Sequence, residues 1–244
     1  MKIAKSILAL MLTVLMVACN FTEEIYLNED GSGKLNIGFD GSEMMSMIPS
    51  DSVRTGEVMD STIVFKDLIR EKKDSIATLS LKEREELMRL EPFSLRMQMN
   101  DAEGLMKFDM FGDFQKISQM NDAFNAFQNA STVGPTAGSK PMPKQADGSA
   151  TKVDYSFKRN TFKRTAKIVD QALFNQSVDS LASAEMFLGG STYTFKYHFP
   201  RRIKRTNLDE ATFSMDGKTL IYEANFLEML KDPESIQIEV ELED

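Results

Sequence analysis

The chain has very little of the chemistry on which many catalytic and metal sites depend. Its 244 residues include one cysteine, one histidine and no tryptophan. A single cysteine cannot form a disulfide within the chain, and one histidine without a thiol partner argues against a zinc or copper site. The lack of tryptophan, an aromatic residue common in carbohydrate sites, counts slightly against sugar binding.

The motifs of the common enzyme classes are also missing. The sequence contains no G-x-S-x-G, G-x-G-x-x-G or P-loop pattern. A Ser-His-Asp hydrolase would have to use His198, which shares one face of an expected strand with Thr194 and Lys196 and is interpreted as an exposed sheet residue. No acidic pair stands out as a catalytic pair. We therefore expect no enzymatic activity, catalytic residue, metal or cofactor.

Methionine, by contrast, is abundant, with 17 residues in the chain. Methionine is both a soft metal ligand and a flexible packing residue. Met44, Met45 and Met47 form the one tight cluster, whereas most other methionines fall at inward positions of expected strands and helices. Core packing is therefore favoured over copper binding.

Long apolar runs are absent except at the N-terminus, where residues 7–17 are apolar apart from Thr13. A membrane-spanning helix needs about 20 such residues. The shorter length is typical of the apolar region of a secretory signal, and Lys2 and Lys5 supply the basic residues before it. Residues 1–18 are therefore predicted to be a signal peptide.

Residues 16–19, MVAC, resemble the lipobox of bacterial lipoproteins, in which small and apolar residues precede an invariant cysteine. Met16 departs from the usual leucine. The resemblance implies cleavage before Cys19, attachment of diacylglycerol to its thiol and acyl chains such as palmitate that anchor the mature protein. Asn20 is not the aspartate that marks inner-membrane retention, which favours the outer membrane. The alternatives are an ordinary signal peptide with a chance cysteine and an N-terminal membrane helix.

Charge is unevenly distributed along an acidic chain. Without residues 1–18, the chain has 27 basic and 37 acidic residues, a net charge of −10, which argues against non-specific nucleic-acid binding. Residues 151–208 nevertheless carry 11 basic and 4 acidic side chains, whereas residues 209–244 carry 2 basic and 11 acidic ones. A basic segment thus precedes an acidic tail.

The basic segment has two interpretations. Its cations could contact an anionic lipid, a polyanionic glycan or another envelope protein. They could also pair with the acidic tail, for example with Glu239, Glu241 and Glu243 on a neighbouring strand, and this pairing is favoured. The candidate contacts are Lys158, Arg159, Lys163, Arg164, Arg201, Arg202, Lys204 and Arg205.

Residues 131–150 divide the chain into two parts of similar composition. They are rich in Gly, Pro, Ser and Ala and have no hydrophobic period, as in a flexible linker or loop. Each flanking part, 19–130 and 151–244, offers few strands to cover its helices. We therefore expect the two parts to form one composite domain.

Hydrophobic patterns predict an α+β protein with antiparallel sheet, about nine strands and four to six helices. Alternating residues predict a hairpin at 23–39 and an aromatic strand at 191–199, in which Tyr193, Phe195, Tyr197 and Phe199 face inward. The other expected strands lie in 93–99, 105–111, 152–168 (two strands), 211–226 (a hairpin) and 235–243. The expected helices lie in 42–48, 65–79, 80–92, 114–127, 170–190 and 226–233.

The short motifs of these elements resemble those of the LppM-type domain of bacterial lipoproteins. The first hairpin contains DGSG (30–33) soon after the cysteine, and a strand ending in FP (199–200) leads to TN (206–207) and the hairpin DGKTL (216–220). Four Asp-Ser motifs also resemble the O-glycosylation acceptors of Bacteroidetes lipoproteins. The resemblance implies an α+β fold, envelope location and contact with lipid or glycolipid, and brings no catalytic residues.

Three functions are consistent with these observations. The first is a membrane-anchored, non-enzymatic binding or interaction module. The second is a carrier that holds an apolar ligand or lipid in a cavity between sheet and helices. The third is a hydrolase with a carboxylate site that no motif reveals, which would require converging acidic residues with raised pKa values.

Overall fold

A computed structural model describes residues 20–47, 58–121, 123, 125, 150–181 and 185–244. The expected signal peptide 1–18, Cys19 and residues 131–149 of the expected linker lie outside the described residues. No helix among the described residues has both the length and the apolar character needed to cross a bilayer.

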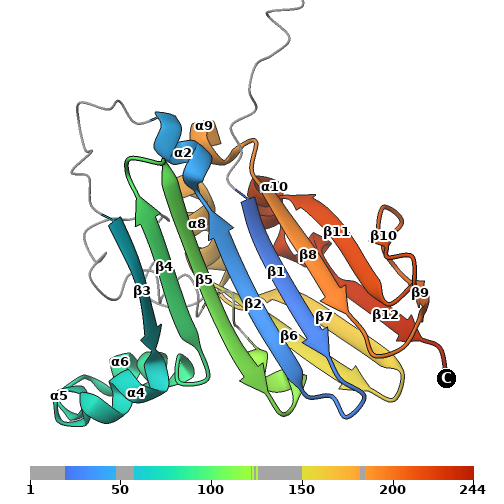
Figure 1. Ribbon diagram of the computed structural model, residues 1–244, viewed down its shortest axis with the longest axis horizontal. Helices are drawn as coiled ribbons and strands as arrows, with labels where there is room; N and C mark the ends of the chain where they lie inside the picture. Colours follow the sequence, from blue (N-terminus) through green and yellow to red (C-terminus); the bar gives the residue numbers. More distant parts are fainter. Residues whose placement is uncertain (1–19, 48–57, 122, 124, 126–149, 182–184) are drawn as a thin grey trace, which may run out of the picture.

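The larger layer is an eight-stranded sheet that combines strands from both parts of the chain (Figure 1). All neighbouring strands are antiparallel except β1 and β8, which run parallel. In spatial order the strands are β10 (Thr212–Phe213), β11 (Thr219–Asn225), β8 (Thr192–His198), β1 (Asn20–Leu27), β2 (Gly33–Asp40), β5 (Leu105–Phe114), β4 (Ser94–Asn100) and β3 (Val58–Val64).

A second, four-stranded antiparallel sheet packs against one face of the first (Figure 1). The ring of Phe162 in the second sheet lies 5.1 Å from Tyr197 in the first, edge to face. The shared core consists of the inward residues of both sheets. The strands, in spatial order, are β6 (Thr151–Lys158), β7 (Thr161–Ile168), β12 (Ile238–Leu242) and β9 (Ile203–Thr206).

Short helices close the ends of the sheets. In Figure 1, α4, α5 and α6 lie beyond the end of β3, whereas α2, α9 and α10 lie near the end where β1 begins. The helical segments are α2 (Ser42–Met47), α4 (Phe65–Glu71), α5 (Lys73–Ala77), α6 (Leu81–Arg89), α8 (Gln171–Leu181), α9 (Glu185–Leu188) and α10 (Phe226–Lys231), with 3₁₀ turns η1 (Ile117–Met120) and η2 (Pro233–Ser235).

The structure confirms the α+β class and the expected inward stripes. Tyr193, Phe195, Tyr197 and Phe199 are all buried, and so are the inward side chains of β4 and β5 except Met99, which is half-buried. Both expected hairpin turns use a glycine with positive φ, Gly31 in the first and Gly217 in the second. The alternation of apolar and polar residues therefore identified the core-facing side of the predicted strands.

The expected strand number was wrong, because the described residues form twelve strands instead of about nine. Two of the additional strands are β3 and β9. Strand β3 lies at the edge of its sheet and alternates only between exposed and half-buried residues, and β9 has four residues, of which two are charged. Neither strand has the fully buried apolar stripe that produces a clear sequence signal.

The helix expected at 114–127 was wrong in its first part. Phe114 is the last residue of β5, and the 3₁₀ turn η1 follows it at Ile117–Met120. The Gln119 side chain accepts hydrogen bonds from the amides of Gln115 and Lys116, at 2.7 and 3.0 Å, and stabilises this tight turn. Apolar residues three apart match a 3₁₀ turn as well as an α-helix.

Candidate functional site

The chain enters the fold immediately after Cys19. Asn20 is the first residue of β1 and is paired with Asp40 on one side and Thr192 on the other. No free residue therefore separates Cys19 from the sheet. A lipid on that cysteine would hold this end of the sheet, hereafter the anchor end, directly at the bilayer.

The opposite end of the sheet carries the loops that follow β1, β6, β8 and β10. We call this end the loop rim, formed by residues 28–32, 199–202 and 214–218, by residues 159–160, and by the last residues of β6 and β10, Lys158 and Phe213. Strand β1 spans seven residue steps between the two ends, which is roughly 23 Å. The rim is therefore separated from the anchor end by more than twice the Debye length of about 8 Å at physiological salt.

Arg201 connects the parts of the loop rim. Its Nε lies 3.1 Å from the Glu29 carboxylate, and its other nitrogens donate to the Glu243 carbonyl at 2.7 Å and the Asn160 side chain at 3.1 Å. These bonds join the β1–β2 turn, the β6–β7 turn, the loop after β8 and the C-terminal residues. Arg201 is thus committed to the structure of the rim.

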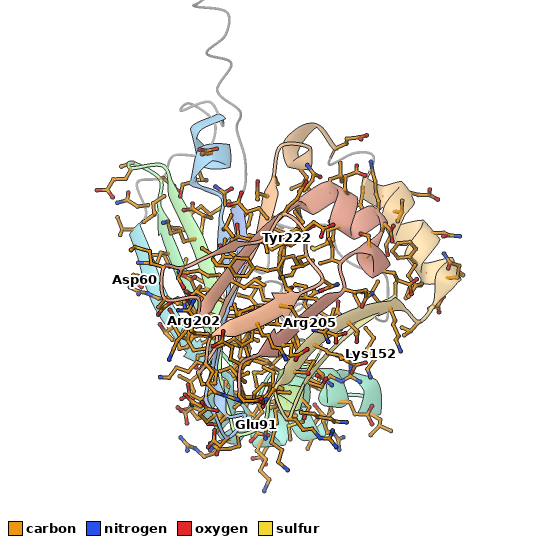
Figure 2. The ribbon with its side chains drawn as sticks, turned by 90° about the vertical axis from the view of Figure 1, so that its right-hand side faces the viewer. Asp60, Glu91, Lys152, Arg202, Arg205 and Tyr222 are labelled. Atoms are coloured by element: carbon orange, nitrogen blue, oxygen red, sulfur yellow. The ribbon has the colours of Figure 1, made fainter. Side chains whose placement is uncertain are left out.

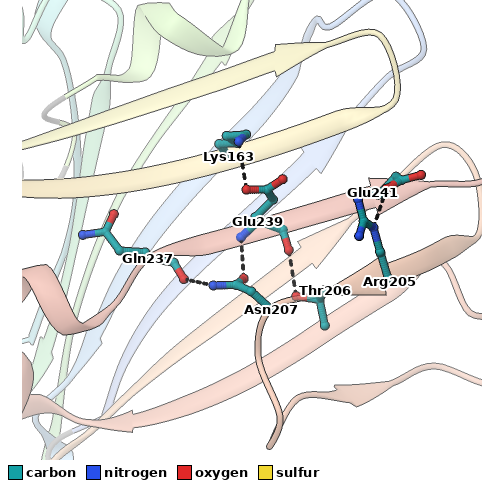
Figure 3. A network of polar contacts seen from close by, with 7 residues as sticks. All are labelled: Lys163, Arg205, Thr206, Asn207, Gln237, Glu239 and Glu241. Atoms are coloured by element: carbon teal, nitrogen blue, oxygen red, sulfur yellow. Dashed lines mark hydrogen bonds and ion pairs between the residues drawn. The ribbon is translucent and has the colours of Figure 1, made fainter.

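Three other cations of the basic segment pair with the acidic tail, as the favoured interpretation predicted. Figure 3 shows Lys163, which lies 2.8 Å from Glu239, and Arg205, which bonds the carboxylate of Glu241. Lys204 bonds the same Glu241 carboxylate at 2.7 Å. The hydrogen bonds from Lys204 and then Arg205 lower the pKa of Glu241. These side chains compensate one another on the outer face of the second sheet.

Lys158, Arg159 and Arg202 remain available at the loop rim. Within the described part of the chain, neither Lys158 nor Arg159 forms an ion pair, and both are exposed. Arg202, visible in Figure 2, is largely exposed and its nearest carboxylate, that of Glu243, is 4.0 Å away. Arg159 adopts a positive φ of 56°, where a glycine would avoid steric strain.

Arg164 lies in the core and does not belong to this exposed set. It is 3% exposed, and its Nε lies 3.4 Å from the carboxylate of Glu23, which is 0% exposed. Glu23 was not among the candidate residues predicted from the sequence. Its signal is nevertheless visible, because Glu23 occupies the inward register of β1 between Phe21 and Ile25.

The Glu23–Arg164 pair joins the two sheets, and aromatic residues of β8 contact both of its members. Tyr193 and Tyr197 donate hydroxyl hydrogen bonds to Glu23, at 2.9 and 2.5 Å, and the Arg164 guanidinium lies 4.8 Å from the ring centre of Phe195. Burial, and then the charge of Glu23, raises the pKa of both tyrosines well above the usual value. Burial, the largest single influence, would lower the pKa of Arg164, but the charge of Glu23 together with the neighbouring tyrosines outweighs it and raises that pKa.

A second polar cluster lies on the outer face of the large sheet, around Glu24. One oxygen of this carboxylate is within hydrogen-bond distance of Tyr26 (2.9 Å), Lys196 (2.8 Å) and His198 (2.9 Å). The other ring nitrogen of His198 lies 3.0 Å from the Thr219 hydroxyl. The Tyr26 and His198 rings stack with centres 4.1 Å apart. The single histidine is thus a half-buried, fully partnered residue of the sheet face.

The Thr219–His198–Glu24 chain has the hydroxyl, imidazole and carboxylate of a hydrolase triad, but its electrostatics favour a structural role. Burial pulls the pKa of Glu24 upward, yet the hydrogen bonds from Lys196 and His198 outweigh it and lower that pKa. The carboxylate is therefore held ionised by several donors at once. These contacts join neighbouring strands on an open sheet face.

A second carboxylate on this face, that of Asp109, differs from Glu24 in having a raised pKa. Asp109 is half-buried, and loss of solvent raises its pKa despite hydrogen bonding by Asn36 and the nearby charge of Lys107. Among the described residues, no group of three or more His, Cys, Asp and Glu could hold a metal ion. Of the methionine cluster, Met45 packs against the core, while the side chains of Met44 and Met47 lie outside the described set.

Comparison with known proteins gives one structural likeness. No protein-family model matches the chain, and no curated protein matches it. The chain is similar to the folded domain of LppM from Mycobacterium tuberculosis, solved by NMR, with a TM-score of 0.42 and 9% identity over 92% of this chain and 89% of that one. The likeness brings no residue role or ligand to this chain.

Proposed function

We propose that the protein is a non-enzymatic lipoprotein of the bacterial envelope, anchored by acylated Cys19, most simply in the outer membrane. The observation that supports this most strongly is that β1 begins at Asn20, the residue after Cys19, so that a lipid on Cys19 would hold the anchor end of the sheet at the bilayer. Under this proposal the folded body stands on the membrane with its loop rim turned away. The carrier and carboxylate-hydrolase alternatives stay untested predictions.

We further propose that the body binds an anionic partner through Lys158, Arg159 and Arg202 at the loop rim. Support comes from the exposure of these cations and from the pairing of Lys163, Lys204 and Arg205 with carboxylates. An arginine also occupies a backbone position that suits glycine better, and strained residues often persist where the side chain has a role. The partner would be an anionic lipid, a glycan or an acidic envelope protein.

A charge-matched pair of triple variants tests the binding proposal. Lys158→Gln, Arg159→Gln and Arg202→Gln together should weaken binding to heparin, or to vesicles containing phosphatidylglycerol, at least tenfold, because each cation near an anionic surface contributes about 1 kcal/mol. The two probes separate a glycan from a lipid source. Binding is measured by co-sedimentation and calorimetry at physiological salt.

The control removes the same three charges from the paired set, as Lys163→Gln, Lys204→Gln and Arg205→Gln. Its binding should change less than about threefold, because these cations are already compensated by Glu239 and Glu241. Equal losses in the two triple variants would show that net charge alone matters and would refute a specific rim site.

Arg159→Gly should separate stability from binding. The change relieves an unfavourable positive φ and is expected to raise the free energy of unfolding by about 0.5–1 kcal/mol, measured in urea. It should weaken binding to the same anionic probe. Arg159→Lys retains both charge and strain, so its stability and binding should stay near those of the parent. A glycine variant that binds as well as the parent would remove Arg159 from the site.

A further inference from the structure

The β10–β11 hairpin presents two apolar side chains at its tip. Met215 is 105% exposed and Phe213 is 48% exposed. Polar contacts hold the turn beneath them: the amides of Lys218 and Thr219 donate to Asp216 at 3.0 Å and to the Ser214 hydroxyl at 2.9 Å. The Met215 side chain is therefore displayed to solvent by an ordered turn.

This hairpin tip belongs to the loop rim and lies among its cations. The Ile203 amide donates to the Gly217 carbonyl at 2.8 Å, which ties the tip to the loop after β8. The Arg202 guanidinium lies so close to Gly217 that a Cβ there would be 3.1 Å from it. Lys218 donates to the Pro200 carbonyl at 2.8 Å. Apolar side chains and cations are thus adjacent.

We infer that the hairpin tip and its neighbouring cations dock on a lipid bilayer, with Met215 and Phe213 entering the boundary between headgroups and acyl chains. This inference rests on the proposed anionic-partner site and names a lipid surface as that partner. Exposed apolar residues beside Arg and Lys match the chemistry of this boundary, where apolar burial and phosphate attraction act together. A glycan would satisfy the cations but would not bury Met215.

The position of the tip indicates that the docking surface differs from the bilayer that would hold Cys19. Strands β8 and β1 run parallel from the anchor end, and β11 begins beside the far end of β8, where Thr219 pairs with His198. The tip therefore lies at the opposite end of the sheet from Asn20. The chain would be anchored in one lipid surface and would dock on another.

A fluorescence experiment tests the docking, because the chain contains no tryptophan. The mature chain, residues 19–244 with Cys19→Ser, carries Met215→Trp as its sole tryptophan. Vesicles of phosphatidylcholine and phosphatidylglycerol should shift its emission to the blue, and lipids brominated near the headgroup should quench it. Val169→Trp is the control, because Val169 is exposed at the other end of β7 and should not respond.

The outcomes separate this inference from the binding proposal. Phe213→Gln with Met215→Gln should lower vesicle affinity roughly tenfold through lost apolar burial, without changing heparin binding. Vesicle binding without a blue shift in the Met215→Trp variant, or unchanged affinity of the double glutamine variant, would overturn insertion while the rim site stands. Loss of heparin binding in the Lys158, Arg159 and Arg202 triple variant reports on the rim site alone.

Discussion

Glu23→Leu is expected to lower the free energy of unfolding by about 3–5 kcal/mol, the cost of breaking a buried ion pair by removing one partner. The substitution leaves the Arg164 guanidinium in the core without its carboxylate and removes the acceptor of the Tyr193 and Tyr197 hydroxyls. Urea unfolding followed by circular dichroism measures the change. If Glu23→Leu is too unstable to purify, Glu23→Gln keeps the shape and gives a smaller loss in the same direction.

A second variant shows whether the unpaired charge causes that loss. Glu23→Leu combined with Arg164→Met should recover at least about 2 kcal/mol, because no uncompensated charge remains in the core. Recovery should be incomplete, since the two tyrosine hydroxyls still lack their acceptor. A double variant less stable than Glu23→Leu alone would contradict the assignment of the cost to Arg164.

The neighbouring residue is the matched control. Glu24→Leu makes the same change one position along β1, on the outer face, where Glu24 pairs with Lys196 and His198. Freed donors on this face can turn to water, so its cost should be about 1 kcal/mol or less. Equal costs at positions 23 and 24 would show that burial between the sheets does not decide the effect.

Cys19→Ser is expected to move the full-length protein from the membrane fraction to the soluble fraction almost completely. Acyl chains contribute about 0.8 kcal/mol for each buried methylene, so two or three chains give stable anchoring and their absence leaves little. Detergent phase partitioning of cell fractions measures this. Met16→Leu restores the usual first lipobox residue and should stay in the membrane. Membrane retention of Cys19→Ser would favour an N-terminal membrane helix instead.

Much of the core could be predicted from alternation, because period-two burial is recorded directly in the identity of successive residues. The strand from Tyr193 to Phe199 illustrates this, since every second residue is aromatic and buried. The edge strand β3 alternates only between exposed and half-buried residues, so no fully buried apolar stripe marks it in the sequence. Glu23 breaks the inward stripe of β1, and its partner Arg164 lies 141 positions away, so only the folded sheets bring the two together.

The contacts of the basic segment could likewise be predicted only in part. Its composition predicted pairing with the acidic tail, and the register of β12 between β7 and β9 places Glu239 and Glu241 beside those cations. Composition could not distinguish Arg164, which points into the core, from Lys163, which points outward, because the two differ only in strand parity. The rim site and the apolar hairpin tip depend on which loops share one end of the sheet.

Mass spectrometry of the N-terminal peptide tests whether the protein is anchored through Cys19. The protein is extracted with detergent from membranes of cells that express the full sequence. We expect the first residue to be Cys19, carrying diacylglycerol and an acylated amino group, with residues 1–18 absent. An unmodified Cys19, or a membrane-associated chain that retains residues 1–18, would contradict anchoring at the start of β1 and the outward orientation of the loop rim that depends on it.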